Sequence, residues 1–333
     1  MEKIWLKQYP AGVPAEIDVN QYASLVALLD ESFRRYADRL AYKFLGRSIR
    51  FGEIDRASAA FAGWLQSQGL VKGDRVAVML PNVPQYPVAV SAILRAGLVV
   101  VNVNPLYTAR ELEHQLKDSG AKAIVILENF ASVLQQVLAA VPTKKVVLAA
   151  MGDMLGFPKS LVVNTVVRKV KKLVPAFELP GAIRFNDALA EGRRMTFSPA
   201  QSGPDDIAVL QYTGGTTGVS KGAVLLHRNL VANILQSEAW YQPALKKIPA
   251  GEQVVTICAL PLYHIFGFNT NMMLSMRMGG CNILIPNPRD LPAMFKELSG
   301  VKVLPRPCES ASLKAMAPGS SNAGTIFLTL RTT

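Results

Sequence analysis

The sequence predicts an α/β protein with doubly wound, mostly parallel sheets that are flanked by helices. Short apolar runs of strand length recur along the chain, and segments with apolar residues at helical spacing separate them. Half of the 333 residues are apolar, which is enough for two domains or for one large α/β domain with an extension. This alternation is typical of a parallel sheet with helices on both faces.

The first 150 residues show the alternation most clearly. Helical spacing predicts helices over about 25–36 and 54–65. The next expected elements are a strand at 75–80, a helix at 84–97, a strand at 98–103, a helix at 109–120 that Gly120 closes, a strand at 123–127, a helix at 131–140 and a strand at 145–150.

The pattern is interrupted at about 151–200 and then resumes. Its elements are a strand at 207–212, a helix from about 229, a strand at 253–260, a helix near 269–278 and a strand at 281–286. We therefore expect a first α/β subdomain over 1–200, with a basic amphipathic insertion at about 151–185. A second α/β subdomain covers 201–300, and a divergent tail with little ordered structure covers 301–333.

Charge and composition narrow the class of protein. The 36 basic and 24 acidic side chains give a net charge of +12, which suggests anionic partners such as nucleotides, CoA-like thiols or an acidic lipid surface. The three cysteines form neither a metal-spaced cluster nor a complete disulfide framework. The longest uncharged run, 76–94, contains three prolines, so we expect no membrane-spanning helix. The N-terminus lacks a signal core, which favours the cytoplasm.

One loop concentrates glycines and hydroxyl side chains before a lysine. Residues 212–222 read YTGGTTGVSKG and lie between an expected strand and an expected helix. Small residues there let backbone N–H groups converge on phosphate oxygens, hydroxyls add donors, and a lysine adds positive charge. The spacing matches neither the P-loop nor the dinucleotide fingerprint. The alternative is a glycine-rich turn without a ligand.

With the AVLLHRNL that follows it, this loop resembles the phosphate-binding signature of the adenylate-forming (AMP-binding) ligases, more closely the long-chain fatty acid–CoA ligases. The resemblance continues in GDRVAVMLPN (73–82), AGLVVVNVNPLYTARELEHQLKDSGA (96–121), LPLYHIFG (260–267) and NPRD (287–290), and covers about residues 1–300. The family usually has Leu-Pro before the lysine. Here Val219 and Ser220 take those places and leave Lys221 in register.

The resemblance implies a two-step reaction. A fatty carboxylate attacks the α-phosphate of ATP to give an acyl-adenylate and pyrophosphate, and the CoA thiol then displaces AMP. ATP, Mg²⁺ and CoA are therefore the expected cofactors and co-substrates, and a fatty acid is the expected substrate. We expect no nucleic-acid partner.

The resemblance also implies the site residues. Lys221 and Thr217 are the catalytic candidates, and Thr213 is the candidate near Mg²⁺. The ATP-binding set is Tyr212, Thr213, Gly214, Gly215, Thr216, Thr217, Gly218, Val219, Ser220, Lys221, Gly222 and Ala223.

Three residues of LPLYHIFG are candidates for the carboxylate and acyl site: His264, Phe266 and Gly267. A single histidine in an apolar stretch is more often a core residue, and the resemblance makes the two interpretations equally good. His114 is expected at a solvated helix position, and His227 at the start of the helix after the loop.

The insertion combines apolar and basic residues at helical spacing. Its basic side chains are Arg168, Lys169, Lys171 and Lys172, among the valines and leucines of 161–174. Such a helix is typical of binding to an anionic membrane surface, here a peripheral position at the inner face of the membrane. The alternative is a solvated helix packed on the sheet.

After Gly300 the resemblance ends, so the expected fold is incomplete at the C-terminus. The family's later adenine-, ribose- and metal-binding motifs and its distal catalytic lysine do not appear in 301–333. We therefore expect impaired acyl-CoA synthesis. Two other functions stay open: a non-catalytic nucleotide- or lipid-binding remnant, and an adenylate-forming ligase for another carboxylic acid.

Overall fold

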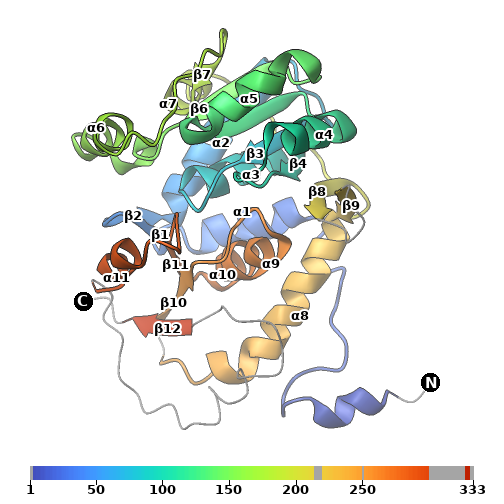
Figure 1. The fold of residues 1–333 in the computed structure, drawn as a ribbon. Coiled ribbons are helices and arrows are strands. Elements are labelled where there is room, and N and C mark those ends of the chain that lie inside the picture. Colours follow the sequence, from blue (N-terminus) through green and yellow to red (C-terminus); the bar gives the residue numbers. More distant parts are fainter. Residues whose placement is uncertain (1–2, 214–219, 250, 300–326, 331–333) are drawn as a thin grey trace.

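Two sheets and the helices that cover them make up the molecule. The computed structural model describes residues 3–213, 220–249, 251–299 and 327–330. A seven-stranded sheet has the order β7-β6-β5-β3-β4-β8-β9, and a five-stranded sheet has the order β12-β10-β11-β1-β2 (Figure 1). The predicted class, mostly parallel sheets flanked by helices, is confirmed.

The seven-stranded sheet contains the strands that the sequence predicts most clearly. Its members are β3 (Arg75–Met79), β4 (Val99–Asn102), β5 (Ala123–Leu127), β6 (Lys145–Ala149), β7 (Ile183–Arg184), β8 (Ile207–Thr213) and β9 (Lys221–Leu226). All neighbours pair in parallel except β8 and β9. Its central strands are buried on both faces, as expected for a parallel sheet between helices.

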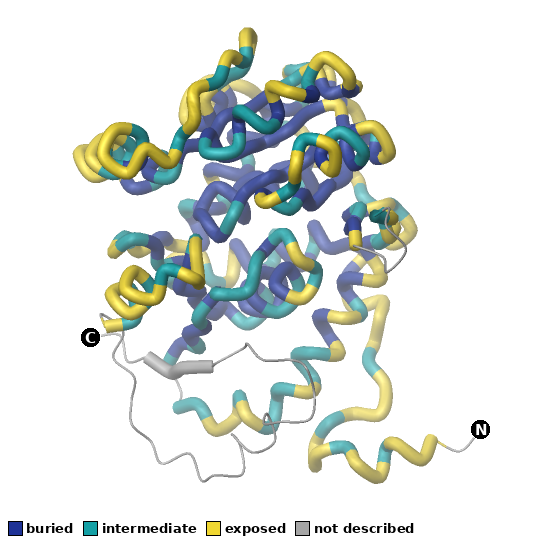
Figure 2. Tube along the Cα trace, in the orientation of Figure 1, coloured by how far each residue is buried: buried dark blue, intermediate teal, exposed yellow. Residues whose placement is uncertain are grey.

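Alternate residues of these strands enter two different cores. Val76 and Val78 belong to the cluster that includes α2 (Phe51–Ser67), α3 (Gln85–Arg95) and α7 (Phe185–Gly192). Ala77 and Met79 belong to the cluster with α4 (Ala109–Ser119) and α5 (Ala131–Val137). Figure 2 shows these strands as a buried layer under more exposed helices. The two-residue period of a strand thus places helices on both faces.

The five-stranded sheet joins segments that are far apart in the sequence. Its strands are β1 (Leu40–Phe44), β2 (Arg47–Arg50), β10 (Gln253–Cys258), β11 (Cys281–Leu284) and β12 (Phe327–Leu330). Tyr42 on β1 pairs in parallel with Asn282 on β11. The sequence analysis did not predict the β1–β2 hairpin. Of the expected tail, β12 is the described part, and it pairs antiparallel with β10.

Helices cover this second sheet on both faces. The helices α1 (Leu25–Arg35) and α8 (His227–Leu245), the π-helical segment Phe268–Leu274 and α10 (Ser275–Met278) share the large core with the first sheet. The apolar side chains Val255 and Ile283 point to the opposite face, where α11 (Leu291–Ser299) packs through Met294 and Leu298.

The connection after the glycine-rich loop differs from the expected strand–loop–helix. Residues 221–226 form β9, antiparallel to β8, and α8 begins only at His227. The edge strand β8 gains a hydrogen-bonding partner in this way, which an immediate helix would not supply. The loop therefore follows a strand and precedes a helix as expected, with the unpredicted strand β9 between them, and the placement of His227 at the helix start is confirmed.

The expected amphipathic insertion begins as α6 (Lys159–Thr165) and continues as a π-helical turn over Val166–Val170. Arg168 does not belong to an open basic face. Its guanidinium binds the buried carboxylate of Glu128 through two hydrogen bonds of 2.8 and 2.9 Å, and Arg184 binds the same carboxylate. None of the described helices has an apolar run long enough to cross a membrane.

Candidate functional site

The β8–β9 hairpin lies at the carboxyl edge of the seven-stranded sheet, where ligands bind in open α/β sheets. Thr213 pairs with Lys221, and Tyr212 pairs with Gly222. The predicted ATP-binding residues between them, Gly214, Gly215, Thr216, Thr217, Gly218 and Val219, lie outside the described residues. Thr213 and Ser220 are the described residues on either side of them.

Two ends of the hairpin are open to solvent. Thr213, Lys221 and Ala223 are exposed, so the lysine ammonium can reach a ligand above the sheet edge. Gly222 has a packing role instead. A side chain there would have its first carbon 2.9 Å from the Tyr212 ring, so glycine allows the ring to lie across β9.

Tyr212 is buried, and its hydroxyl donates a hydrogen bond to Asp118 at the end of α4. Burial, followed by this hydrogen bond and the carboxylate charge, raises the pKa of Tyr212 above its usual value. The phenol therefore stays neutral at physiological pH. Its side chain anchors β8 to α4.

His114 also contacts the hairpin, contrary to the expected solvated position. It is half-buried on α4, and its Nε2 lies 3.1 Å from the carbonyl oxygen of Ser220. Because a carbonyl only accepts, Nε2 carries the proton and donates. His114 reaches the hairpin because α4 packs on the face of the sheet next to it, which brings one turn of the helix to the loop exit.

The segment 260–267 contains the predicted acyl-site residues. His264 is exposed and precedes α9 (Ile265–Gly267), where its Nδ1 accepts a hydrogen bond from the Phe266 N–H at 3.3 Å. The core alternative for His264 is therefore wrong. Phe266 is 40% exposed. Gly267 is buried, and a side chain there would collide with the Pro261 carbonyl oxygen at 2.3 Å.

Asn82 fixes this segment from the first sheet. Its side-chain amide donates to the carbonyl oxygens of Cys258 and Leu260 at 2.9 and 3.0 Å, and its Oδ1 accepts from the Leu262 N–H at 2.8 Å. The residue is 3% exposed. Sequence reasoning had not singled it out, although it is a polar residue directly after an apolar strand.

A second buried chain of hydrogen bonds connects the hairpin to the same segment. The Tyr86 hydroxyl lies 2.6 Å from Asn102 Oδ1 and 2.8 Å from the Leu262 carbonyl oxygen. Asn102 donates to Gln211 Oε1 at 3.1 Å, and Gln211 donates to the Tyr263 carbonyl oxygen at 3.1 Å. Gln211 is two residues before Thr213, and Tyr263 is next to His264. The predicted phosphate and acyl residues therefore lie on neighbouring segments.

The sequence analysis missed Tyr86, Asn102 and Gln211 as well. The signal that could have revealed them is a polar residue inside an apolar strand, as in the run VVVN of β4. Buried polar side chains are rarely left without partners, so such a residue indicates a specific hydrogen-bond network.

The described residues do not form a magnesium site by themselves. Among residues 3–213, 220–249 and 251–299, no group of three or more His, Cys, Asp or Glu side chains could hold a metal ion. The predicted metal residue, Thr213, would offer one neutral hydroxyl, which Mg²⁺ accepts only beside stronger oxygen ligands such as phosphates and water.

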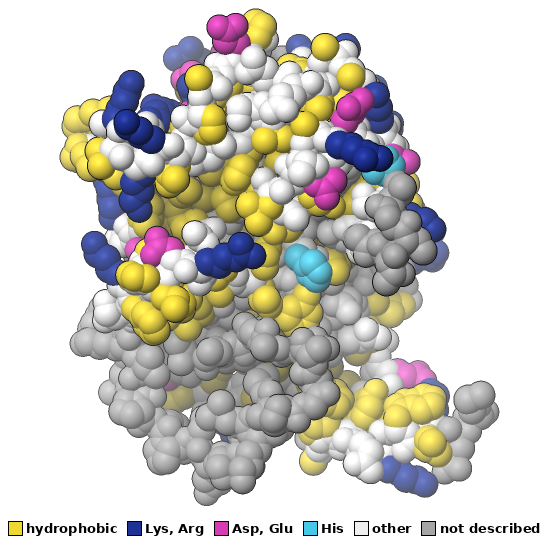
Figure 3. All heavy atoms as spheres, in the orientation of Figure 1, with side chains coloured by type: hydrophobic (Ala, Val, Ile, Leu, Met, Phe, Trp, Pro, Cys, Tyr) yellow, Lys and Arg dark blue, Asp and Glu magenta, His cyan; other side chains and the backbone are white. Residues whose placement is uncertain are grey.

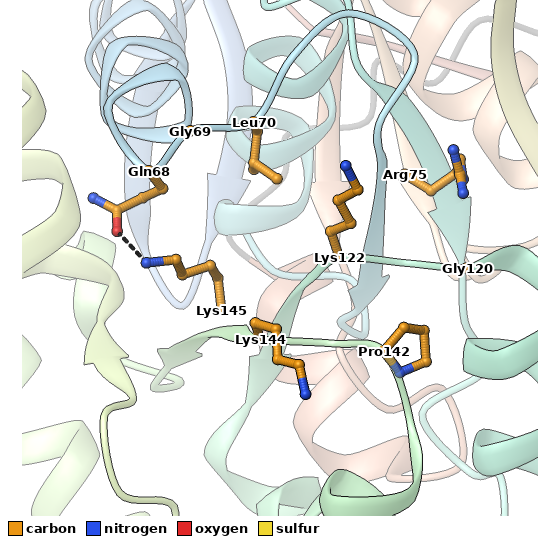
Figure 4. Close-up of a pocket in the computed structure, with 9 residues that line it drawn as sticks. All are labelled: Gln68, Gly69, Leu70, Arg75, Gly120, Lys122, Pro142, Lys144 and Lys145. Carbon is orange, nitrogen blue, oxygen red and sulfur yellow. Dashed lines mark hydrogen bonds between the residues drawn. The ribbon is translucent and has the colours of Figure 1, made fainter.

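An open hollow of about 470 Å³ lies elsewhere, at the amino edge of the seven-stranded sheet. Figure 4 shows Arg75, Lys122, Lys144 and Lys145 around it, with Lys145 donating to Gln68 Oε1 at 3.2 Å. These residues precede or begin β3, β5 and β6, so they lie at the edge opposite the glycine-rich loop. The hollow is not part of the candidate site.

Known proteins resemble this chain in sequence and in fold. A family model described as AMP-binding enzyme matches residues 29–304. The chain is 53% identical over 300 residues to the long-chain-fatty-acid–CoA ligase of Escherichia coli O6:H1 (strain CFT073), covering 90% of this chain and 53% of that protein. It is 34% identical over 286 residues to the ligase of the same name from Bacillus subtilis (strain 168), covering 86% and 50%. The chain spans about half the length of these curated relatives.

Solved structures of low sequence identity share the fold. A long-chain-fatty-acid-CoA ligase from Archaeoglobus fulgidus superposes with a TM-score of 0.67 at 22% identity, over 88% of this chain and 52% of that one. An anthranilate CoA ligase in complex with anthranoyl-AMP superposes with a TM-score of 0.69 at 19% identity, over 85% and 50%.

Proposed function

The chain belongs to the AMP-binding enzyme family, and from this premise we propose that it acts in the ATP-dependent activation of a long-chain fatty acid. The carboxylate attacks the α-phosphate of ATP and releases pyrophosphate, and the CoA thiol then displaces AMP from the acyl-adenylate to give the thioester. One observation carries the proposal. The hydrogen bond from Gln211 to Tyr263 holds the strand before the glycine-rich loop against the segment that contains His264.

This juxtaposition suits a reaction between two anions. Bringing a carboxylate to a phosphate requires compensation of negative charge and exact alignment more than covalent chemistry. We assign the charge to Lys221, whose side chain is exposed at the loop exit. Backbone N–H groups and hydroxyls of the loop, including Thr217, would supply further donors. Mg²⁺, if it accompanies ATP, would be held mainly by phosphate oxygens, with Thr213 beside it.

The part of the proposed site that would bind the fatty acid combines the apolar ring of Phe266 with one polar side chain, that of His264. His264 can donate a hydrogen bond to the carboxylate through Nε2, because its Nδ1 is engaged by the Phe266 N–H. The exposed ring of Phe266 offers apolar surface to an acyl chain, and the backbone at Gly267 turns closely around Pro261. CoA is the co-substrate of the second step.

The test is ATP affinity after loss of the lysine charge. Lys221→Ala should weaken ATP binding by about 1.5–3 kcal/mol, because a charge-assisted contact to phosphate is lost. Isothermal titration calorimetry measures this, and the urea midpoint should not move. Lys144→Ala is the matched control, since Lys144 is an exposed lysine at the opposite edge of the sheet. Equal ATP affinities of wild type and Lys221→Ala would overturn the assignment.

The carboxylate class is tested separately. Palmitate, an aromatic acid and an amino acid are each added with ATP, and exchange of labelled pyrophosphate into ATP is followed. Palmitate-dependent exchange supports the fatty acid. Exchange with another acid alone favours the alternative ligase, and ATP binding with no exchange at all favours the non-catalytic remnant.

A second candidate function, contact with an anionic membrane, is favoured by the surface of the insertion. We define the basic segment as residues 157–173. Several of its apolar side chains are exposed, with Phe157 at 88%, Val170 at 71% and Leu161 at 61%, whereas Val167 is buried. Lys169, Lys171 and Lys172 are exposed beside them. Figure 3 shows basic and apolar side chains together over α6. This combination is typical of peripheral membrane binding.

Co-sedimentation with vesicles that contain anionic lipid tests this candidate. Replacing Lys169, Lys171 and Lys172 by Gln should weaken binding by about 1 kcal/mol per residue, and salt should weaken the binding of the wild type. Arg168 is excluded from the set because it binds Glu128. A triple replacement of Lys117, Lys144 and Lys246 by Gln removes the same charge elsewhere. Binding that responds equally to both triple variants would contradict the assignment.

A further inference from the structure

We propose that His114 is a positioning residue of the ATP site, which holds the exit of the glycine-rich loop so that Lys221 points at the phosphates. The inference rests on the proposed function of that loop. It goes beyond it by naming a residue on a different element, about 100 positions earlier in the chain, that acts on the site through Ser220.

The contact has a defined direction. Nε2 of His114 lies 3.1 Å from the carbonyl oxygen of Ser220 and donates to it, because the carbonyl can only accept. A backbone carbonyl is fixed relative to its own peptide plane, and that plane includes the nitrogen of Lys221. Holding the Ser220 carbonyl therefore orients the backbone from which the lysine side chain departs.

The helix that carries His114 is rigidly placed. Leu112 and Leu116 on α4 are fully buried in the core. At the N-terminus, the Thr108 hydroxyl accepts from the Glu111 N–H, and the Glu111 carboxylate accepts from the Thr108 N–H at 2.8 Å. A capping box of this kind secures the first turn. The imidazole is thus presented from a framework that moves little.

Two neighbouring contacts secure the same hairpin. Burial raises the pKa of Tyr107, and the neighbouring Ser220 side chain opposes this effect. On the other strand, Tyr212 donates to Asp118 at the end of α4. His114 therefore holds the loop exit, with Tyr107 beside it, while Asp118 holds the loop entry, and all three come from residues 107–118.

The hairpin needs this support because β9 is an edge strand. It pairs with β8 and is otherwise mostly exposed, and no further strand pairs with it among the described residues. A lysine on an unsupported edge samples many positions, and ordering it on binding reduces the affinity. The bond from His114 removes part of that cost before ATP arrives.

The test compares three variants by calorimetric titration with Mg²⁺ and ATP. His114→Ala should weaken ATP binding about 3–10-fold, because the loop exit loses its tether. His114→Gln should restore most of the affinity, since the Gln side-chain amide can donate to the same carbonyl. Glu113→Ala is the matched control on α4, because among the described residues Glu113 pairs with the solvent-exposed Lys117 on the same helix and with no residue of the hairpin. It should bind ATP as the wild type does.

A double-variant cycle separates positioning from general structural support. In the Lys221→Ala background, His114→Ala should change ATP affinity less than about twofold, because the lysine that it positions is gone. Independent effects of the two substitutions would overturn the inference, as would equal affinities of wild type and His114→Ala. A wild type that binds no ATP would instead overturn the proposed function, and the inference with it.

Discussion

The two sheets of this protein are assembled in different ways. The central strands of the seven-stranded sheet, β3 to β6, follow one another within about 75 residues and are almost wholly apolar. The five-stranded sheet pairs β1 with β11, more than 200 residues apart, and carries Tyr42, Thr256 and Asn282 in its buried layer. The first sheet is a local construction, whereas the second depends on contacts between distant segments.

Because of this difference, we expect the seven-stranded sheet to be stable by itself and the five-stranded sheet to depend on contacts with it. Helices pack both faces of β3 to β6 with fully buried side chains. The outer face of β10 and β11 is covered by the half-exposed helix α11. Asn82, in the connection after β3, and Tyr86 on α3 hold the segment that follows β10. The candidate site lies where the two parts meet, so its geometry depends on this junction.

The largest expected effect is the loss of unfolding free energy when one buried isoleucine in each sheet is truncated to alanine. Ile124→Ala on β5 should cost about 3–5 kcal/mol of unfolding free energy, and Ile283→Ala on β11 about 2–3 kcal/mol. Both side chains are almost completely buried, but Ile283 faces a smaller cluster that can collapse around the cavity. Urea denaturation of both variants measures the difference. Equal costs would mean that the two sheets are equally well packed.

A smaller loss of unfolding free energy is expected when the hydrogen bonds between Asn82 and residues 258–262 are removed. Asn82→Ala removes three hydrogen bonds to the backbone of residues 258–262 and leaves the Leu262 N–H without its partner, although the Cys258 carbonyl still accepts from the Ile285 N–H. The loss should cost about 2–3 kcal/mol. Amide exchange should accelerate in β10 and β11 and stay slow in β5 and β6. Asn186→Ala removes an exposed amide that donates to the Asp153 carbonyl oxygen, and it should cost less than about 0.5 kcal/mol. Uniform acceleration across both sheets would contradict the dependent role of the second.

The smallest effect concerns acid stability at the start of α8. His227 is buried, its Nδ1 accepts from the Leu25 N–H at 3.2 Å, and burial lowers its pKa to about 4. Asp206 and Lys72, the charged groups near it, act in opposite directions. Between pH 6.5 and 4 the unfolded chain binds a proton that the folded chain excludes. Stability present above pH 6.5 is therefore lost as the pH falls towards 4.

The measurement is the unfolding free energy at pH 7.5 and pH 5. The wild type should lose about 2 kcal/mol more over this range than His227→Gln, which keeps an acceptor for Leu25 without a titrating group. If the two proteins lose the same stability, His227 is not the group that links α1 and α8 to pH.

Several features follow from local patterns and were predictable. Apolar runs gave β3, β4, β5 and β6 within one or two residues, and Gly120 ends α4 in the left-handed conformation that favours glycine. The short β1–β2 hairpin escaped prediction because its stabilising partner is β11, far along the chain. The strand β9 escaped because it is an exposed partner of β8 rather than a buried strand of its own.

The candidate site shows the same division. Residue types alone predicted the glycine-rich loop and Lys221, because glycines, hydroxyls and one lysine in a row are rare without a ligand. The segment of His264 was predicted only through the family resemblance. The roles of His114, Asn82 and Gln211 appeared only in the fold, since each acts on a backbone group 50 to 180 positions away.

The sequence by itself determined the class of sheet, the order of its central elements and the family to which the chain belongs. These features depend on periodicity and on residue types that act within a few positions of one another. The tertiary structure decided which polar side chains connect β8 to the segment 260–267, and that Arg168 binds the buried carboxylate of Glu128. The physical reason is that a hydrogen bond or ion pair is specified by position in space, and residues far apart in the sequence become neighbours only when the sheets have formed.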